Sequence, residues 1–336
     1  MPPFDLSRFP RLPLLGGPTP IQELTRLNAD LGGVRVFVKR DDFTSVGGGG
    51  NKLRKLEFLL GEARAQGADT IITIGARQSN HARLTAAASA RAGFACELIL
   101  PRVVARTDDD YVHNGNVLLD HLLGAYVHDL AGDADVAGFA AERIDALARQ
   151  SRKVYFAPVG GSNATGCLGY AACALEIAEQ EATLGLKFSR ALVPNGSSGT
   201  HAGLAAGFAL TPKGAAFAKS YAVYYPADKT RAITLGIARD VIAKIGASCD
   251  ISESDILVDG DHRGEGYGIP TQRMIDAVRL MARTEGLLLD PVYSGKAFAG
   301  LLHDIRAGAY KPGECVLFLM TGGTPGLFAY RAALAG

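Results

Sequence analysis

The chain has 336 residues, which suggests about two domains at roughly 150 residues each. Hydrophobic residues make up 48% and charged residues 21%, and this composition excludes a disordered chain. The net charge of +1 gives no field that would attract nucleic acid. Glycine is in excess, with 41 residues or about 12% against an average of about 7%, which indicates tight turns or backbone lying close to a ligand.

Targeting and metal-binding signals are missing from the sequence. No apolar run reaches the roughly 18 residues of a membrane span, and the first residues do not resemble a secretory signal. The five cysteines are scattered without a CxxC pair, which favours a reducing cytoplasm over disulfides or structural zinc. The histidines form no HExxH motif, so we expect no metal.

Apolar strand patterns alternate with helical patterns along the chain. Strands are predicted at 34–38, 70–74, 96–100, 154–157, 191–193, 221–225, 256–258 and 316–319. Helices are predicted at 56–66, 81–92, 116–123, 136–150, 166–181, 201–210, 271–285 and 296–306. Continuous apolar strands separated by helices predict an α/β fold whose parallel sheet is covered on both faces. Ligands bind such sheets beyond the carboxyl ends of the strands, where glycine turns should lie.

A glycine run leads into the first candidate site residue. Gly47–Gly50 precede Asn51 and Lys52, and the run lacks the Gly-Lys-Ser/Thr of a Walker A loop. Lys52 begins a helix, where the positive helix end and the nearby Arg54 and Lys55 disfavour its charged form. A lysine with a lowered pKa can act as a Schiff-base nucleophile. A flexible loop before a solvated basic helix start is the alternative interpretation.

A second glycine-rich turn, at 196–203, opens the helix that follows a short strand. Successive free N–H groups and hydroxyls at a helix start can cradle a phosphate. The spacing is GxxGxxxG, so the dinucleotide fingerprint GxGxxG is not met. A purely structural turn remains possible at this stage.

Three further segments carry polar side chains near strand ends. Gln78, Ser79 and Asn80 stand at a helix start, where they could bind a carboxylate or simply cap the helix, and Arg77 before them adds a cation. Tyr267 and Tyr293 occupy turns, although a lone tyrosine usually serves packing. Thr321 follows the last strand and could bond a ring nitrogen. Together the segments favour pyridoxal 5′-phosphate (PLP) beside a small amino-acid substrate.

Motifs over nearly the whole chain resemble one family. They lie at 9–11, 18–20, 38–42, 50–58, 78–81, 114–116, 158–163, 199–203, 290–293 and 321–323. In them the sequence resembles PLP-dependent D-cysteine desulfhydrases, L-cysteate sulfo-lyases and 1-aminocyclopropane-1-carboxylate (ACC) deaminases. The resemblance implies a tryptophan-synthase-β-like fold, with PLP in the cleft between two α/β domains. The small domain would be 51–162, and 1–50 with 163–336 would form the large domain.

The resemblance also implies roles for individual residues. Lys52 would be the Schiff-base lysine and then the general base at the substrate α-carbon. The cofactor would be held by Lys52, Lys55, Asn80, Gly196, Ser197, Ser198, Gly199, Thr200 and Thr321, with Thr321 at the ring nitrogen and Asn80 at the ring oxygen. The substrate would be bound by Arg77, Gln78, Ser79, Asn80, Tyr267 and Tyr293. Further catalytic roles would fall to Ser79, Tyr267 and Tyr293.

The implied activity is β-elimination from D-cysteine, which yields pyruvate, sulfide and ammonia. L-cysteate is the alternative substrate if Arg77 faces the pocket and pairs with the sulfonate. His113 also slightly favours the L-cysteate enzymes of the family. ACC deaminase activity is disfavoured because Ser294 stands where those enzymes carry glutamate. A non-catalytic PLP-binding or amino-acid-binding protein would have lost Lys52 or the tyrosines. Met320 and Asn195 depart from the pattern of the family, so the exact substrate preference stays open. The resemblance further implies a cytoplasmic homodimer.

Overall fold

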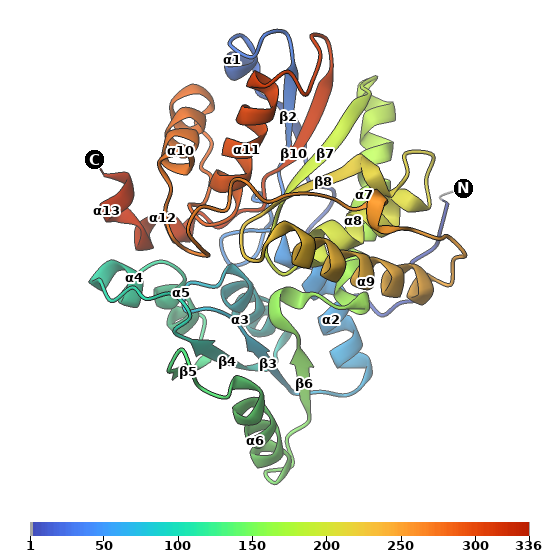
Figure 1. The fold of residues 1–336 in the computed structure, drawn as a ribbon. Coiled ribbons are helices and arrows are strands. Elements are labelled where there is room, and N and C mark those ends of the chain that lie inside the picture. The colour runs from blue at the N-terminus through green and yellow to red at the C-terminus, as the bar shows by residue number, and fades with distance from the viewer. Residues whose placement is uncertain (1–2, 336) are drawn as a thin grey trace.

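The computed structural model describes residues 3–335, and their strands form two sheets. The larger sheet has six strands in the order β1-β2-β10-β7-β8-β9 (Figure 1). These are β1 (Ile21–Glu23), β2 (Arg35–Lys39), β7 (Phe188–Asn195), β8 (Ala218–Ala222), β9 (Leu257–Asp259) and β10 (Cys315–Leu319). Neighbouring strands are parallel except for β1, which runs antiparallel to β2.

The smaller sheet is parallel throughout and has the order β5-β4-β3-β6. Its strands are β3 (Thr70–Ile74), β4 (Ala95–Pro101), β5 (Tyr126–Leu130) and β6 (Val154–Ala157). The chain therefore leaves the larger sheet after β2, builds the smaller sheet and returns at β7. The predicted domain boundaries at 51 and 162 stay a prediction, because the helix that starts at Lys52 also packs against the helix that starts at Ala164.

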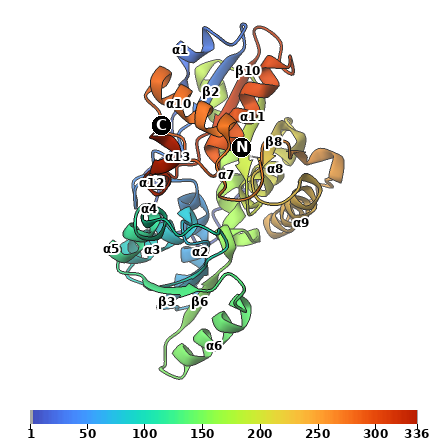
Figure 2. The same ribbon diagram turned by 60° about the vertical axis from the view of Figure 1, so that its left-hand side comes forward.

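Helices cover both sheets. They are α1 (Thr25–Asn28), α2 (Lys52–Ala65), α3 (Asn80–Ala92), α4 (Asp109–His113), α5 (Asn116–Leu122), α6 (Val136–Ala148), α7 (Ala164–Leu184), α8 (Gly199–Ala209), α9 (Ala227–Ile245), α10 (Gln272–Glu285), α11 (Ser294–Arg306), α12 (Pro325–Ala329) and α13 (Arg331–Leu334). Both ribbon views place α6 at the end of the smaller lobe that points away from the larger sheet (Figures 1 and 2).

The alternation of side chains along β10 shows why the larger sheet is buried on both faces. Val316 and Phe318 belong to a core cluster with α10 and α11, whereas Leu317 and Leu319 belong to a cluster with α7 and α8. All four side chains are fully buried. Successive strand residues point to opposite faces, so a continuous apolar strand needs helices on both sides. The predicted α/β architecture is confirmed.

Several predicted elements were wrong or missed. The strand expected at 221–225 lies at Ala218–Ala222. It contains the polar residues Lys219 and Ser220, which the apolar pattern does not include. Their side chains are hydrogen-bonded to Asp304 and Asn195. Helix α9 was missed because Thr230 and Thr234 occupy its buried face and hide the apolar stripe. Strands β1 and β5 lie at sheet edges, and their side chains are half-buried or exposed, so neither forms a continuous apolar run.

A buried ion network ties α2 to the larger sheet. Arg54 donates to both oxygens of Asp41 at 2.8 and 3.0 Å and to Glu176 of α7 at 2.8 Å. Tyr170 also donates to Asp41, at 2.5 Å, and Lys39 of β2 pairs with Glu176. Burial alone would raise the pKa of Asp41, but the charge and hydrogen bonds of Arg54 outweigh it and hold the pKa below its usual value.

We expect Arg54→Met to destabilise the protein by about 3–5 kcal/mol, because it leaves Asp41 as a buried carboxylate without its main partner. The matched control is Arg35→Met, which removes a guanidinium paired with Glu23 at the surface and should cost about 1 kcal/mol or less. Urea unfolding followed by circular dichroism measures both. Equal losses in the two variants would contradict a special role for the Arg54 network.

Candidate functional site

A cavity of about 660 Å³ lies where strands of both sheets end and helices begin. Its lining includes residues that follow β3, β7 and β10, together with the first turns of α2, α3 and α8. Parallel strands place their carboxyl ends at one edge of the sheet, and helix starts there carry free N–H groups and partial positive charge. The cavity therefore lies where the sequence predicted ligand binding.

The glycine run before Lys52 adopts backbone that other residues avoid. Gly47–Gly50 all have positive φ, between 59° and 143°. At Gly49 a Cβ atom would come within 2.0 Å of the Asp42 carbonyl oxygen, so only glycine fits. Gly50 bridges to Gly322, and the N–H of Asn51 donates to the Thr321 carbonyl at 3.0 Å. The run thus brings Lys52 and Thr321 to the same cavity.

Lys52 is partly buried and is the first residue of α2. Desolvation lowers its pKa well below the usual lysine value, and the charge of Lys55 lowers it further. Lys55 stands three residues later and shares its helix face, whereas Arg54 lies in the ion network described above. The effect expected from Arg54 on Lys52 was therefore wrong. The structure supports a Lys52 amine that is neutral at a lower pH than a solvated lysine.

The turn at 196–200 has the geometry of an anion cradle. Ser198 has φ +65° and precedes α8 directly, so a left-handed residue is followed by helical ones. A Cβ on Gly199 would lie 2.5 Å from Ser162 Oγ and 2.6 Å from Lys55 Nζ. Ser197 Oγ lies 2.8 Å from Ser162 Oγ, and Asn51 Nδ2 donates to Thr200 Oγ1 at 3.0 Å. These contacts fix the shape of the loop.

Lys55 lies behind this loop and does not line the cavity. Its Nζ donates to the Gly160 carbonyl at 3.0 Å and to Ser162 Oγ at 3.1 Å. Burial lowers the pKa of Lys55. Its position beside Gly199 puts a lysine close to any anion that the loop binds.

At the start of α3, Ser79 and Asn80 line the cavity, whereas Gln78 does not. Ser79 caps the helix by accepting from Ala82 N at 3.1 Å, and both Ser79 and Asn80 line the cavity. Asn80 Oδ1 accepts from Asn116 Nδ2 at 2.9 Å. Gln78 does not line the cavity, since its amide nitrogen donates to the carbonyls of Tyr111 and Asn114, each at 2.8 Å.

The contact of Gln78 with a substrate carboxylate stays a prediction, and the bonds of its side-chain amide do not favour it. Its Oε1 accepts from Asn116 N at 2.9 Å, so the whole amide group is used to hold the turn that presents Asn116. Arg77 also points elsewhere, with Nη2 bonded to the two Asp129 oxygens at 2.7 and 2.9 Å. Arg77 is absent from the cavity lining among the residues the structure describes, so its contact with a sulfonate stays a prediction without support from this geometry.

Tyr267 and Tyr293 meet across the cavity. Their hydroxyl oxygens lie 2.5 Å apart, and both rings line the cavity although they are 26 residues apart in the chain. Burial raises the pKa of Tyr267 well above its usual value, and it raises the pKa of Tyr293 as well. Both hydroxyls therefore stay protonated at neutral pH and can supply protons. The sequence named both tyrosines but not their contact.

Thr321 lines the cavity as predicted, and the two departures near it differ in role. Met320 is buried in the core of the larger sheet. Asn195 lines the cavity, and its Nδ2 donates to Ser220 Oγ at 3.0 Å. Its Oδ1 is buried and has no hydrogen-bond partner among the described residues.

Several residues around the cavity were not named from the sequence. His81 contacts Thr73 Oγ1 at 2.9 Å, and burial lowers its pKa well below the usual histidine value, so it is neutral. Asn116 holds Asn80 from a helix start after Gly115, whose φ of +64° was a readable signal in the sequence Asn-Gly-Asn. Tyr224 and Tyr225 follow β8 and line the cavity, where Tyr224 packs edge-on against Tyr267 at 4.8 Å.

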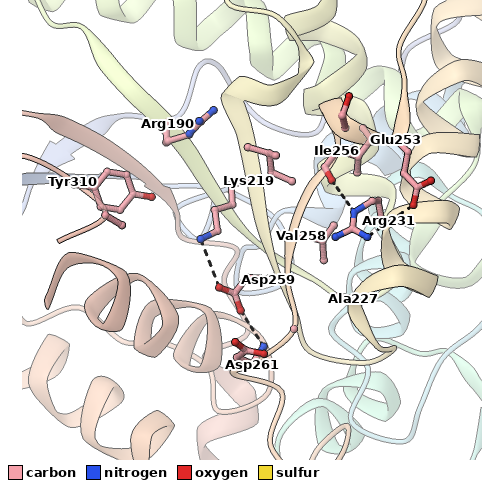
Figure 3. A pocket seen from close by; sticks show the side chains of 14 residues that line it. Arg190, Lys219, Ala227, Arg231, Glu253, Ile256, Val258, Asp259, Asp261 and Tyr310 are labelled. Carbon is pink, nitrogen blue, oxygen red and sulfur yellow. Dashed lines mark hydrogen bonds and ion pairs between the residues drawn. The ribbon is translucent and has the colours of Figure 1, made fainter. Parts of the chain in front are cut away.

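A second hollow, of about 960 Å³, lies beside the edge strand β9 (Figure 3). Its charged side chains are engaged in ion pairs, as Lys219 is with Asp259 of the lining at 3.6 Å (Figure 3). Lys219 also pairs at 2.5 Å with Asp304, which lies outside the lining. Arg231 likewise pairs with Asp228 at 2.8 Å. None of the site residues that the sequence predicted lines this hollow. Its size therefore does not make it the candidate site.

No helix among residues 3–335 combines the length and apolar character needed to cross a membrane. No three histidine, cysteine, aspartate or glutamate side chains among them gather in a way that could hold a metal ion.

Comparisons with known proteins cover almost the whole chain. Residues 12–322 match the family described as "Pyridoxal-phosphate dependent enzyme". A D-cysteine desulfhydrase of Yersinia enterocolitica is 43% identical over 327 residues, which are 97% of each chain. The crystal structure of an ACC deaminase homologue matches with TM-score 0.87 and 35% identity over 98% of this chain and 97% of the other. An O-ureido-L-serine synthase structure matches with TM-score 0.64 and 17% identity over 95% and 96%, and this shows the fold alone.

We expect Gly199→Ala to weaken the binding of pyridoxal 5′-phosphate by about 10- to 100-fold, because the added methyl group displaces the loop from one or two hydrogen bonds to the phosphate. The matched control is Gly236→Ala in α9, where a Cβ would meet nothing within 4 Å. Titration with the cofactor, followed by its absorbance, measures both. Unchanged affinity in Gly199→Ala would show that this loop does not bind the phosphate.

Proposed function

The chain belongs to the pyridoxal-phosphate-dependent enzyme family, and we propose that it removes the sulfur of a cysteine-type amino acid by β-elimination. With D-cysteine and water, the products are pyruvate, hydrogen sulfide and ammonia. The 43% identity to a D-cysteine desulfhydrase over 97% of the chain supports this substrate. The main structural support is that one cavity contains Lys52, the turn at 196–200 and the Tyr267–Tyr293 pair.

The residues present fit pyridoxal 5′-phosphate. Gly199 lets the start of α8 pack against Ser162 and the buried Lys55 amine, where a Cβ would clash, and a buried amine beside a helix start suits a phosphate. Lys52 has no carboxylate partner among the described residues, so its amine is available to hold the cofactor aldehyde. We propose that Thr321 faces the ring nitrogen and Asn80 the ring oxygen. When bound, the cofactor supplies an aldehyde for the substrate amino group and a ring that accepts electrons from the α-carbon.

Lys52 and the tyrosines then divide the proton transfers. The lowered pKa of Lys52 favours its neutral amine, which can take the proton from the substrate α-carbon. Tyr267 and Tyr293 stay protonated and can donate to the sulfur as the bond between the β-carbon and sulfur breaks. Ser79 and Asn80 lie at the start of α3, where the free N–H groups and the helix end favour the substrate carboxylate.

The charges around the cavity favour cysteine over cysteate. Among the described lining residues, Lys52 is the one lysine, and no arginine lines the cavity. His81, also in the lining, is neutral because of its lowered pKa. The sulfonate of L-cysteate would therefore lose its hydrating water in the cavity without gaining an arginine or a histidinium as a partner. Burying a charge without a partner is costly. A thiol suits the same space better.

Position 294 argues against ACC deaminase activity. The Ser294 hydroxyl donates to Asp290 Oδ1 at 2.6 Å and is buried under the start of α11. It therefore stabilises the turn that presents Tyr293 and offers no acid to the cavity. Ring opening without a sulfur leaving group needs more acid–base assistance than this arrangement provides.

We propose that the protein is a cytoplasmic homodimer with a large domain of 1–50 and 163–336 and a small domain of 51–162. All five cysteines are unpaired, which suits a reducing compartment. Leu118, Leu122 and Phe328 are at least 54% exposed on the neighbouring helices α5 and α12, and this apolar surface suits a second copy. A monomer in sedimentation equilibrium at micromolar concentration would contradict the dimer.

The function is tested by a product assay on D-cysteine, L-cysteine, L-cysteate and ACC side by side. We expect sulfide and pyruvate from D-cysteine, and much less sulfite from L-cysteate or 2-oxobutanoate from ACC. Lys52→Ala should abolish both turnover and the visible absorption of the lysine-bound cofactor. An inactive wild type that carries the cofactor would refute the proposed reaction, whereas preferred turnover of L-cysteate or ACC would refute the substrate.

A second experiment tests whether Arg77 reads the substrate. Because Arg77 is bonded to Asp129 outside the cavity, Arg77→Ala should leave KM and kcat for D-cysteine and for L-cysteate within about twofold of wild type. A selective rise in KM for L-cysteate would show instead that Arg77 binds the sulfonate.

A further inference from the structure

Lys296 is a lysine inside the fold with no carboxylate in an ion pair with it among the described residues. It lies in the first turn of α11 and is 1% exposed. Its Nζ donates to the carbonyl oxygens of Arg263 at 2.6 Å and Gly266 at 2.9 Å. Burial lowers the pKa of Lys296 to about 8. Placing this amine inside costs free energy, so the contacts that it makes need an explanation.

Both carbonyls belong to the loop at 260–270 that carries Tyr267. The loop joins β9 to α10 and has no helix or strand of its own. Gly264 and Gly268 have φ of +71° and +72°, so flexible glycines flank the tyrosine. The Gly266 carbonyl forms the peptide bond that leads into Tyr267. Lys296 therefore holds the backbone directly beside the tyrosine, and Tyr330 holds the other side by donating to the Gly268 carbonyl at 2.7 Å.

The helix that carries Lys296 also carries the partner tyrosine. Tyr293 stands at the N-cap of α11, and its N–H donates to Asp290 Oδ2 at 2.9 Å. One rigid element thus presents Tyr293 directly and grips the loop of Tyr267 three residues later. The 2.5 Å distance between the two hydroxyl oxygens depends on both attachments.

We propose that Lys296 is a positioning residue that fixes the Tyr267 hydroxyl against the Tyr293 hydroxyl by clamping the 260–270 loop to α11. Because the two tyrosines donate the proton in the proposed function, the catalytic consequence rests on that function. The clamp itself does not, and it can be measured without any substrate.

The first test is hydrogen exchange of the holoenzyme followed by mass spectrometry. Lys296→Met removes the donors while keeping an unbranched side chain, and it should speed exchange in the peptide that covers 260–270. Exchange in the peptides that cover α2 and the 196–200 loop should be unchanged. The control is Lys213→Met, which removes a lysine paired with Glu181 at 2.8 Å and lies outside the cavity lining. Equal exchange of the loop in Lys296→Met and wild type would overturn the clamp.

The second test is a double-mutant cycle in D-cysteine turnover. We expect Lys296→Met to lower kcat by about 100-fold with KM and cofactor absorbance nearly unchanged, since it misplaces a proton donor and removes no binding contact. Tyr267→Phe should lower kcat to a similar degree. In the Tyr267→Phe background, Lys296→Met should change kcat by less than about twofold, because the tyrosine hydroxyl through which it acts is gone.

Each result has a separate meaning. If the fold-losses in kcat of the two single variants multiply in the double variant, Lys296 acts independently of the Tyr267 hydroxyl. That result would overturn the positioning role. If Lys296→Met does not fold, Lys296→Gln keeps one amide donor and should give smaller changes in the same loop and in kcat. If wild type turns over none of the substrates, the proposed function fails, while the exchange experiment still decides whether Lys296 clamps the loop.

Discussion

The pairing of Arg54 with Asp41 and Glu176 decides where α2 lies, and the active cavity depends on α2. A buried guanidinium needs its carboxylates, so this face of the helix must turn toward β2 and α7. Residues two apart on a helix point in different directions, whereas residues three apart share a face. Once Arg54 is committed to the network, Lys52 faces the cavity and Lys55 lies behind the turn at 196–200 that we propose binds the phosphate. One ion network thus positions two chemical groups that it does not touch.

The cavity then operates mainly with groups that burial keeps neutral. Desolvation lowers the pKa of Lys52 and His81 and raises the pKa of Tyr267 and Tyr293. An amine that is free of its proton and hydroxyls that keep theirs are the forms that proton transfer from carbon to sulfur requires. The same low polarity makes a second negative charge on the substrate unfavourable. The proposed preference for a thiol and the proposed elimination therefore have one physical origin.

Rigid helix starts hold most of the polar groups in place. Ser79 caps α3, Gly199 opens α8, and Asp290 accepts the N–H groups that begin α11. Tyr267 is the exception because it lies on a loop with glycines on both sides. Lys296 and Tyr330 attach that loop to the surrounding structure. The proposed role of Tyr267 as a proton donor 2.5 Å from the Tyr293 hydroxyl requires that its loop be held in place.

The sequence by itself determined the α/β architecture, the cavity at the strand ends, and the identity of Lys52, the 196–200 turn, Asn80, Thr321 and both tyrosines as its candidate residues. Apolar strand runs and glycine turns are local, so they can be read along the chain. Only the tertiary structure decided where polar side chains point. Gln78 binds backbone carbonyls and Arg77 binds Asp129, although both precede a helix start as a ligand residue would.

The contact of Tyr267 with Tyr293 and the clamp by Lys296 likewise join segments that no local pattern connects. Helix α9 escaped prediction because threonines form part of its buried face. The physical reason is the same in each case. Backbone preference and apolar periodicity are properties of neighbouring residues, whereas the partner of a charge or hydroxyl is chosen by whichever distant segment folding brings beside it.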